Sequence, residues 1–132
     1  MDGIVALRDQ IAPNTLIIGN GDVDDREHGQ ALVDKHGIDG VMIARGIFHN
    51  PYAFAEDSNS NRGKDELIGL LKRHLDLYDQ YAYVTTRPYD TLKRFFKIYI
   101  RDFEGASDLR TELMNTRTTD DARILIDTHT TK

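Results

Sequence analysis

Two short apolar segments, each ending in a glycine turn, constrain the fold of this chain more than any other part of its sequence. Residues 16–22 read Leu-Ile-Ile-Gly-Asn-Gly-Asp, and residues 40–46 read Gly-Val-Met-Ile-Ala-Arg-Gly. Their separation of about 24 residues accommodates a strand, a crossover helix and a second, parallel strand. Both turns are therefore expected to open at the same edge of a parallel sheet, where they can share one anionic ligand.

Apolar periodicity and helix-capping residues predict the elements around these turns. The short segment Thr15–Ile18 is rich in β-branched residues and is typical of a strand buried on both faces. Asp24 or Asp25 can cap the following helix, which is expected to end near His36-Gly37. The other predicted elements of this part are a helix over residues 4–11, a second strand over residues 41–43, and a short helix with Asn50 as its cap and Pro51 at its first position.

A polar stretch without periodicity separates this part from a region with the apolar pattern of helices. Residues 57–64 are small, polar or charged, which predicts an interdomain linker. Beyond them, apolar stripes one helix face wide predict helices over residues 65–83, 88–103, 106–115 and 119–127. The predicted parts of the chain are residues 1–56, the linker 57–64 and residues 65–132.

The net charge of −5 is divided unevenly along the chain. Residues 1–60 carry 4 lysines and arginines and 10 acidic residues, whereas residues 61–132 carry 13 lysines and arginines and 12 acidic residues. Within the second part, residues 91–101 hold cations and no acid, and such a patch can attract a polyanion even in an acidic chain. A solvated helix face would show the same pattern. The cations of this stretch are Lys93, Arg94, Lys97 and Arg101.

Several kinds of site are excluded by what the sequence lacks. It has no cysteine, so it contains no disulfide and no thiolate nucleophile. Its five histidines are not spaced as metal ligands, and we expect no metal site. No apolar run reaches about 18 residues, and the first residues lack the pattern of a secretory signal. We therefore expect no membrane association and a cytoplasmic location.

The glycine turns have the chemistry of a phosphate site. Glycine lets backbone N–H groups converge on a phosphate without side chains in the way. Arg45 adds a cation able to make bidentate contact, and the helix after each turn is expected to point the positive end of its dipole to the same place. The alternative is that these glycines only form tight strand-to-helix turns. Asp22 is interpreted as a turn residue rather than a catalytic carboxylate.

Longer strings of residues extend the two turns and continue into the helical part. Residues 17–23 read Ile-Ile-Gly-Asn-Gly-Asp-Val, and residues 42–52 read Met-Ile-Ala-Arg-Gly-Ile-Phe-His-Asn-Pro-Tyr. They resemble the last two strands of tRNA-dihydrouridine synthases, flavin enzymes built on a (β/α)8 barrel. Residues 92–101 and 105–110 are similar to the C-terminal helical domain of that family. The resemblance covers essentially the whole chain.

The resemblance implies both a fold and a function. The fold would be α/β and mostly helical: an incomplete C-terminal part of a (β/α)8 barrel (residues 1–56), with two parallel strands, followed by a four-helix tRNA-binding domain (residues 65–132). The chain would be a C-terminal fragment of an enzyme that reduces uridine in tRNA to 5,6-dihydrouridine, with FMN as cofactor and NAD(P)H as reductant. The family's general acid is a cysteine that would precede Met1, so we expect the fragment itself to be inactive and assign no catalytic residue.

The resemblance also implies roles for particular residues. Those expected at the FMN phosphate are Asn20, Gly21, Asp22, Ala44 and Arg45. Those expected at tRNA phosphates are Lys93, Arg94, Lys97 and Arg101. Two positions depart from the family pattern: Ala44 stands where glycine is more common, and Phe95 stands where histidine is often found.

Two other functions remain open at this point. The same phosphate turns would suit a different FMN-dependent barrel oxidoreductase with a small-molecule substrate, although such an enzyme has no need of a basic helical domain. The chain could also be a stand-alone helical module that binds nucleic acid, in which the strands only brace the helices. In each case two isolated strands leave unpaired edges, which predicts a homodimer or a domain-swapped assembly.

Overall fold

A computed structural model describes residues 2–58 and 60–130. Asn59, within the predicted linker, and the last two residues of the predicted helical domain lie outside the described residues. The chain divides into two compact units, Met1–Ser60 and Asn61–Lys132, called here unit 1 and unit 2. The elements of unit 1 are α1 (Asp2–Ile11), β1 (Ile18–Asn20), α2 (Arg26–His36), β2 (Gly40–Met42) and the 3-10 helix η1 (Arg45–Phe48). Those of unit 2 are α3 (Lys64–Thr85), α4 (Asp90–Lys93), α5 (Phe96–Tyr99), α6 (Ala106–Asn115) and α7 (Thr119–Thr130).

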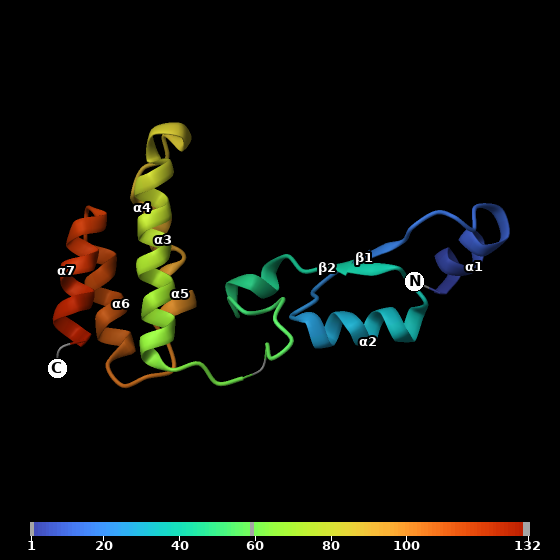
Figure 1. The fold of residues 1–132 in the computed structure, drawn as a ribbon, viewed down its shortest axis with the longest axis horizontal. Helices are drawn as coiled ribbons and strands as arrows, with labels where there is room; N and C mark the ends of the chain where they lie inside the picture. The colour runs from blue at the N-terminus through green and yellow to red at the C-terminus, as the bar shows by residue number, and fades with distance from the viewer. Residues whose placement is uncertain (1, 59, 131–132) are drawn as a thin grey trace. The chain divides into compact units, whose positions relative to one another are not determined.

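The strands of unit 1 form the parallel pair that the sequence predicts. β1 and β2 are joined through α2, which packs against β2 (Figure 1). The register pairs Ile18 with Gly40 and Asn20 with Met42. The predicted bounds of β1 were wrong, because the strand begins at Ile18 rather than at Thr15. Thr15 belongs instead to the turn after α1, because its N–H bonds to the Ala12 carbonyl at 2.9 Å.

The predicted burial of the first strand on both faces was also wrong. Ile18 is 55% exposed and Met42 is 53% exposed. Among the described elements of unit 1, only α2 packs closely against the pair of strands, so the side chains that point away from it meet solvent. The sheet therefore carries an uncovered apolar surface.

Local capping explains where α2 begins and ends. The Asp25 carboxylate accepts a hydrogen bond from the His28 N–H at 2.8 Å, as an N-cap residue should. At the other end Gly37 takes a left-handed conformation with φ +64°, and its N–H bonds to the Val33 carbonyl. The predictions for this helix are confirmed.

The short helix predicted after Asn50 is replaced by turns. The Asn50 side-chain oxygen accepts from the Tyr52 N–H at 2.9 Å, so Asn50 does act as a local cap. The N–H of Ala53 then bonds to the Asn50 carbonyl across three residues, which closes a turn instead of extending a helix. Helical backbone lies earlier than predicted, in η1.

Three helices of unit 2 follow the predicted positions, and one does not. α3, α6 and α7 correspond to the predictions at 65–83, 106–115 and 119–127, with α3 and α7 slightly longer than expected. The single helix predicted over residues 88–103 was wrong, because the chain forms the separate helices α4 and α5. Between them the N–H of Phe95 bonds to the Leu92 carbonyl at 2.8 Å, three residues back, which tightens the backbone and breaks the helix.

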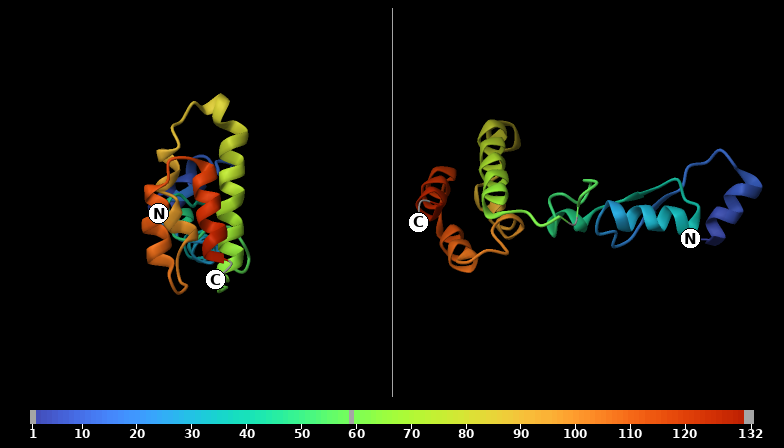
Figure 2. Two further views of the ribbon diagram at one scale, coloured as in Figure 1. Left: turned by 90° about the vertical axis from the view of Figure 1, so that its left-hand side faces the viewer. Right: turned by 60° about the horizontal axis from the view of Figure 1, so that its bottom comes forward.

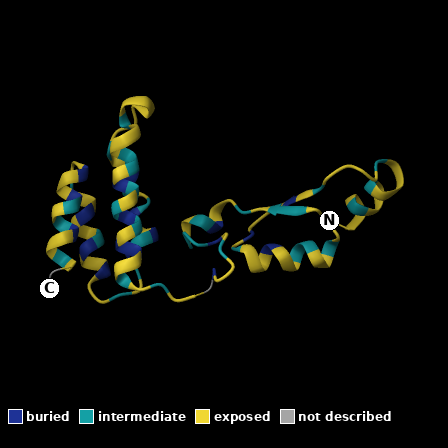
Figure 3. Ribbon diagram, in the orientation of Figure 1, coloured by how far each residue is buried: buried dark blue, intermediate teal, exposed yellow. Residues whose placement is uncertain are grey.

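The core of unit 2 lies where its helices face one another. α7 packs against both α3 and α6, and α5 packs against α3 and α6 (Figures 1 and 2). The buried positions of each helix line its inner side (Figure 3). The helices α3, α5, α6 and α7 each contribute to the largest fully buried side chains, and Ile100, just after α5, completes the set. The helical members are Leu71 and Leu75 of α3, Phe96 of α5, Leu109 and Leu113 of α6, and Ile126 of α7.

Candidate phosphate site and basic pocket

The two glycine turns open at the same edge of the parallel sheet. Asn20, the last residue of β1, is paired with Met42, the last residue of β2. The turns also touch each other, because a Cβ at Gly46 would overlap the carbonyl oxygen of Asp24 and lie 2.8 Å from that of Val23. Only glycine permits this backbone contact. The structure therefore brings the two predicted halves of the site together.

The first turn has a backbone that favours glycine and leaves it accessible. Gly21 has a φ of +130°, which L side chains rarely adopt, and Asp22 follows with a φ of +46°. Apart from Gly21 itself and its two chain neighbours, no heavy atom lies within 4 Å of the position that a Cβ would take there. A ligand oxygen can therefore approach the backbone of this turn without displacing a side chain.

An ion pair joins the two turns. The Arg45 guanidinium of the second turn donates to the Asp22 carboxylate of the first. Both side chains are about three-quarters exposed, at 76% and 77%. Because the pair is held by solvent-exposed groups, an incoming anion can compete with Asp22 for Arg45 at small cost.

Ala44 fits its position despite the departure from glycine. Its φ is −108°, so the backbone needs no left-handed conformation there. An alanine can therefore stand at the second turn without the left-handed conformation that favours glycine.

The expectation of two helix dipoles aimed at this edge was wrong for the second turn. That turn leads into η1, a 3-10 helix of 4 residues. At the first turn, α2 already uses its leading N–H groups: that of Arg26 bonds to the Ala53 carbonyl at 2.7 Å, and that of His28 bonds to Asp25. The donors left for an anion are therefore the turns themselves and Arg45, rather than the helix ends.

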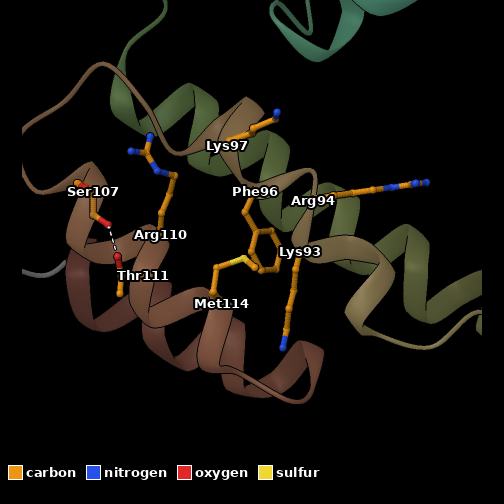
Figure 4. A pocket seen from close by; sticks show the side chains of 8 residues that line it. All are labelled: Lys93, Arg94, Phe96, Lys97, Ser107, Arg110, Thr111 and Met114. Carbon is orange, nitrogen blue, oxygen red and sulfur yellow. Dashed lines mark hydrogen bonds between the residues drawn. The ribbon is translucent and has the colours of Figure 1, made fainter.

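Unit 2 contains a pocket of about 430 Å³ between α4–α5 and α6 (Figure 4). We call it the basic pocket. Four of its lining side chains are cationic, and none of the described residues that line it is acidic. The lining residues are Lys93, Arg94, Phe96, Lys97, Ser107, Arg110, Thr111 and Met114.

Three of the four cations predicted to contact tRNA line this pocket. Lys93 forms an ion pair with Asp90 at 2.7 Å, and the Arg94 guanidinium lies 4.6 Å from the centre of the Phe95 ring. Lys97 is exposed. Arg101 lies beyond α5, outside the pocket lining, with its Nε 3.4 Å from the Asp102 carboxylate. The predicted cluster is therefore divided by the end of α5.

Sequence reasoning missed Arg110. It lies on α6 and donates to the Ile100 carbonyl at 2.9 Å, which holds its guanidinium at the edge of the pocket. Arg110 stands outside the acid-free stretch 91–101, so charge counting along the chain does not find it. Only the packing of α5 against α6 brings it to the same pocket as Lys97.

The contacts of His74 are with other side chains of unit 2 and indicate a role in packing. Its Nδ1 lies 3.1 Å from the Tyr99 hydroxyl, and its ring packs beside that of Phe95 with centroids 5.4 Å apart. Burial lowers the pKa of His74 below its ordinary value. Burial beside the Phe95 and Tyr99 rings therefore favours the neutral form of this histidine.

Neither a metal cluster nor a membrane span is found in the part of the chain that the structure describes. No three histidine, aspartate or glutamate side chains in residues 2–58 and 60–130 are grouped so that they could hold a metal ion. None of the helices there combines the length and apolar character needed to cross a membrane.

Comparison with known proteins gives a consistent result. A sequence model described as dihydrouridine synthase matches residues 1–132. The probable tRNA-dihydrouridine synthase 2 of Bacillus subtilis (strain 168) is 52% identical over 124 residues, which cover 94% of this chain and 38% of the relative. A probable tRNA-dihydrouridine synthase of Staphylococcus epidermidis is 52% identical over 128 residues, or 97% of this chain and 39% of the relative. A probable tRNA-dihydrouridine synthase of Staphylococcus aureus (strain Mu50) is 51% identical over 127 residues, which cover 96% of this chain and 38% of the relative.

These matches cover only part of each relative. The chain spans less than two-fifths of the length of the curated relatives it matches.

Proposed function

Because the chain belongs to the dihydrouridine synthase family, we propose that it forms part of a flavin-dependent enzyme that reduces uridine to dihydrouridine in tRNA, with NAD(P)H as the reductant. The observation that carries this proposal is the match, over nearly the whole chain, to probable tRNA-dihydrouridine synthases. The activity is proposed for a longer protein acting in the cytoplasm. These 132 residues contain no cysteine to serve as general acid, so we expect no reduction of uridine from them alone.

Unit 1 is proposed to hold the phosphate of FMN at its two turns. The open backbone at Gly21 and the exposed guanidinium of Arg45 fit a phosphate oxygen. When bound, FMN would supply the hydride that reduces the uracil ring. The chain's own part is to fix the phosphate. The proposed contacts are Asn20, Gly21 and Asp22 from one turn and Ala44 and Arg45 from the other.

Within this site the backbone and the side chain of Asp22 have opposite effects. Its N–H belongs to the glycine turn and can donate to a phosphate oxygen. Its carboxylate pairs with Arg45 and repels an anion. Phosphate binding would therefore separate this ion pair and leave Arg45 to the ligand.

Unit 2 is proposed to contact the tRNA backbone. Lys93, Arg94 and Lys97 line one pocket, and Arg101 follows them after α5. The supporting observation is the concentration of cationic side chains around that pocket with no acidic side chain among its described lining.

The proposal for unit 2 is tested by the salt dependence of tRNA affinity. The 132-residue chain is titrated with tRNA at several salt concentrations, beside a variant that combines Lys93→Gln, Lys97→Gln and Arg101→Gln. Each phosphate contact contributes about 0.7 to 0.9 to the slope of log affinity against log salt, so the variant should bind more weakly with a slope lower by about 2 to 3. Arg73→Gln, which removes one exposed cation outside the basic pocket, is the control for the general effect of charge.

Two results would contradict this assignment. One is the absence of tRNA affinity in the unsubstituted chain at low salt. The other is an equal loss of affinity in Arg73→Gln, which would show that overall charge, rather than this cluster, determines binding. Circular dichroism of each variant verifies that the helices are retained.

A further inference from the structure

We propose that the basic pocket holds a single unstacked nucleotide of RNA, with its phosphate on Lys97 and Arg110 and its base against Met114. This inference rests on the proposed function, because it takes RNA as the ligand. It goes beyond phosphate contact by assigning the pocket to one nucleotide of a loop or single-stranded segment.

The cations at the edge of the pocket are suited to a phosphate. Lys93 is the pocket cation whose charge is offset by a carboxylate, Asp90 at 2.7 Å. In the described part of the chain, Lys97 has no ion pair. Arg110 donates to the Ile100 carbonyl, which orients its guanidinium and leaves further N–H donors for a ligand. A mobile ammonium and an oriented guanidinium together can neutralise one phosphate.

The interior of the pocket is apolar. Figure 4 shows the side chains of Phe96 and Met114 lying beside each other between the cations. Phe96 is only 2% exposed and forms the base of the pocket, whereas Met114 is 50% exposed and offers its thioether to a ligand. Sulfur makes favourable contacts with aromatic rings, and a nucleobase presents such a ring. A volume of about 430 Å³ lies within the range of small-ligand sites.

Cations at the edge of the pocket and an apolar interior together favour an unstacked nucleotide over a duplex. The faces of bases in a duplex are covered by their neighbours, so a duplex can reach the cations but not the thioether. A nucleotide in a loop can place its base against Met114 while its phosphate remains at Lys97. The pocket should therefore prefer single-stranded RNA, and the apolar contact should carry that preference.

The test compares a short oligouridylate, an RNA duplex and tRNA as ligands of the 132-residue chain. Met114→Ala should weaken oligouridylate binding about two- to tenfold without changing the salt slope, because it removes a contact that carries no charge. It should leave duplex affinity unchanged. Lys97→Gln should weaken binding of all three ligands and lower the oligouridylate slope by about 0.7. Met114 is half exposed, so its truncation leaves no buried cavity.

Two further variants separate this inference from a general effect of charge or folding. Arg110→Lys keeps the charge but loses the fork of donors, and it should bind oligouridylate less tightly than the unsubstituted chain but more tightly than Arg110→Gln. Ile124→Ala is the control for Met114→Ala, because Ile124 is an exposed apolar residue of α7 outside the basic pocket. Ile124→Ala should leave the affinity for all three RNA ligands unchanged.

Each outcome identifies which proposal fails. If tRNA binds but Met114→Ala leaves oligouridylate binding unchanged, or weakens duplex binding equally, the pocket inference is overturned and the proposed tRNA contact stands. If oligouridylate binding depends on Met114 and Lys97 while tRNA does not bind, the pocket inference stands and the tRNA contact fails. If the chain binds none of the three ligands, both are overturned.

Discussion

The Arg45 guanidinium is paired with the Asp22 carboxylate across the two glycine turns of unit 1. The residue proposed to attract a phosphate is therefore already engaged by an anion from the other half of the site. When a phosphate binds at this edge, it replaces the Asp22 carboxylate as the partner of Arg45. The affinity for phosphate therefore depends on both Arg45 and Asp22.

This exchange predicts opposite effects for substitutions of the two partners. Arg45→Gln removes the cation and should weaken FMN binding about tenfold or more, the usual contribution of a charged hydrogen bond. Asp22→Asn keeps the side-chain shape and tolerates the positive φ, but removes the competing charge, so it should strengthen binding. Quenching of flavin fluorescence measures both affinities. Equal affinities in the two variants would rule out the exchange.

The close contact at Gly46 predicts a large effect on stability. Gly46→Ala places a methyl group against the backbone of Asp24, so the turns must separate, and unit 1 should lose about 1 to 3 kcal/mol. Hydrogen exchange of the β1 and α2 amides, followed in urea, measures this loss.

Gly3→Ala is the control within the same unit. Gly3 lies in α1, and beyond its chain neighbours and the backbone of that helix no heavy atom lies within 4 Å of its Cβ position. Alanine should therefore be neutral or stabilise the helix by about 0.5 to 1 kcal/mol. If Gly46→Ala proves equally harmless, the two turns are not in backbone contact in solution.

The buried position of His74 predicts a pH dependence of stability. Its pKa is lowered in the folded state, so the unfolded chain takes up more protons as the pH falls through about 6.5. Stability should therefore fall below that pH and level off once the pH is under the lowered folded-state pKa. His74→Gln, which can still hydrogen-bond to the Tyr99 hydroxyl, should flatten this decline in thermal melts. A decline as steep in His74→Gln as in the unsubstituted chain would contradict the prediction.

The uncovered strands predict self-association of the isolated chain. Ile18 and Met42 are exposed on a sheet of two strands, and such edges and apolar faces recruit other chains. Light scattering over a range of concentrations should show dimers or larger assemblies, and Met42→Glu should shift the population towards monomer. Ile124→Lys, a substitution at an even more exposed apolar residue of unit 2, should leave the population unchanged. A monomer at every concentration would contradict the prediction.

Local signals in the sequence predicted the parts of the fold that depend on neighbouring residues. The cap at Asp25 and the left-handed Gly37 lie within one helix, so both ends of α2 could be read from sequence. The break between α4 and α5 could not. Leu92, Phe96 and Ile100 fit a continuous helix, and no residue pattern marks the turn in which the Phe95 N–H bonds to the Leu92 carbonyl.

The same distinction applies to the candidate sites. The meeting of the two turns follows from the topology of parallel strands, which the spacing of the glycine motifs specifies. Arg110 reaches the basic pocket through packing between helices, and no pattern along the chain reports that contact.

The break between α4 and α5 has a consequence for the motions of the basic pocket. Helices of 4 residues are not stable by themselves, so this wall keeps its shape only while Leu92 and Phe96 remain docked in the core. It should therefore exchange its amide hydrogens faster than α6, the long helix that forms the opposite wall. A nucleotide that contacts both walls would slow amide hydrogen exchange mainly in residues 90–99. Binding would therefore be detected as an ordering of α4 and α5.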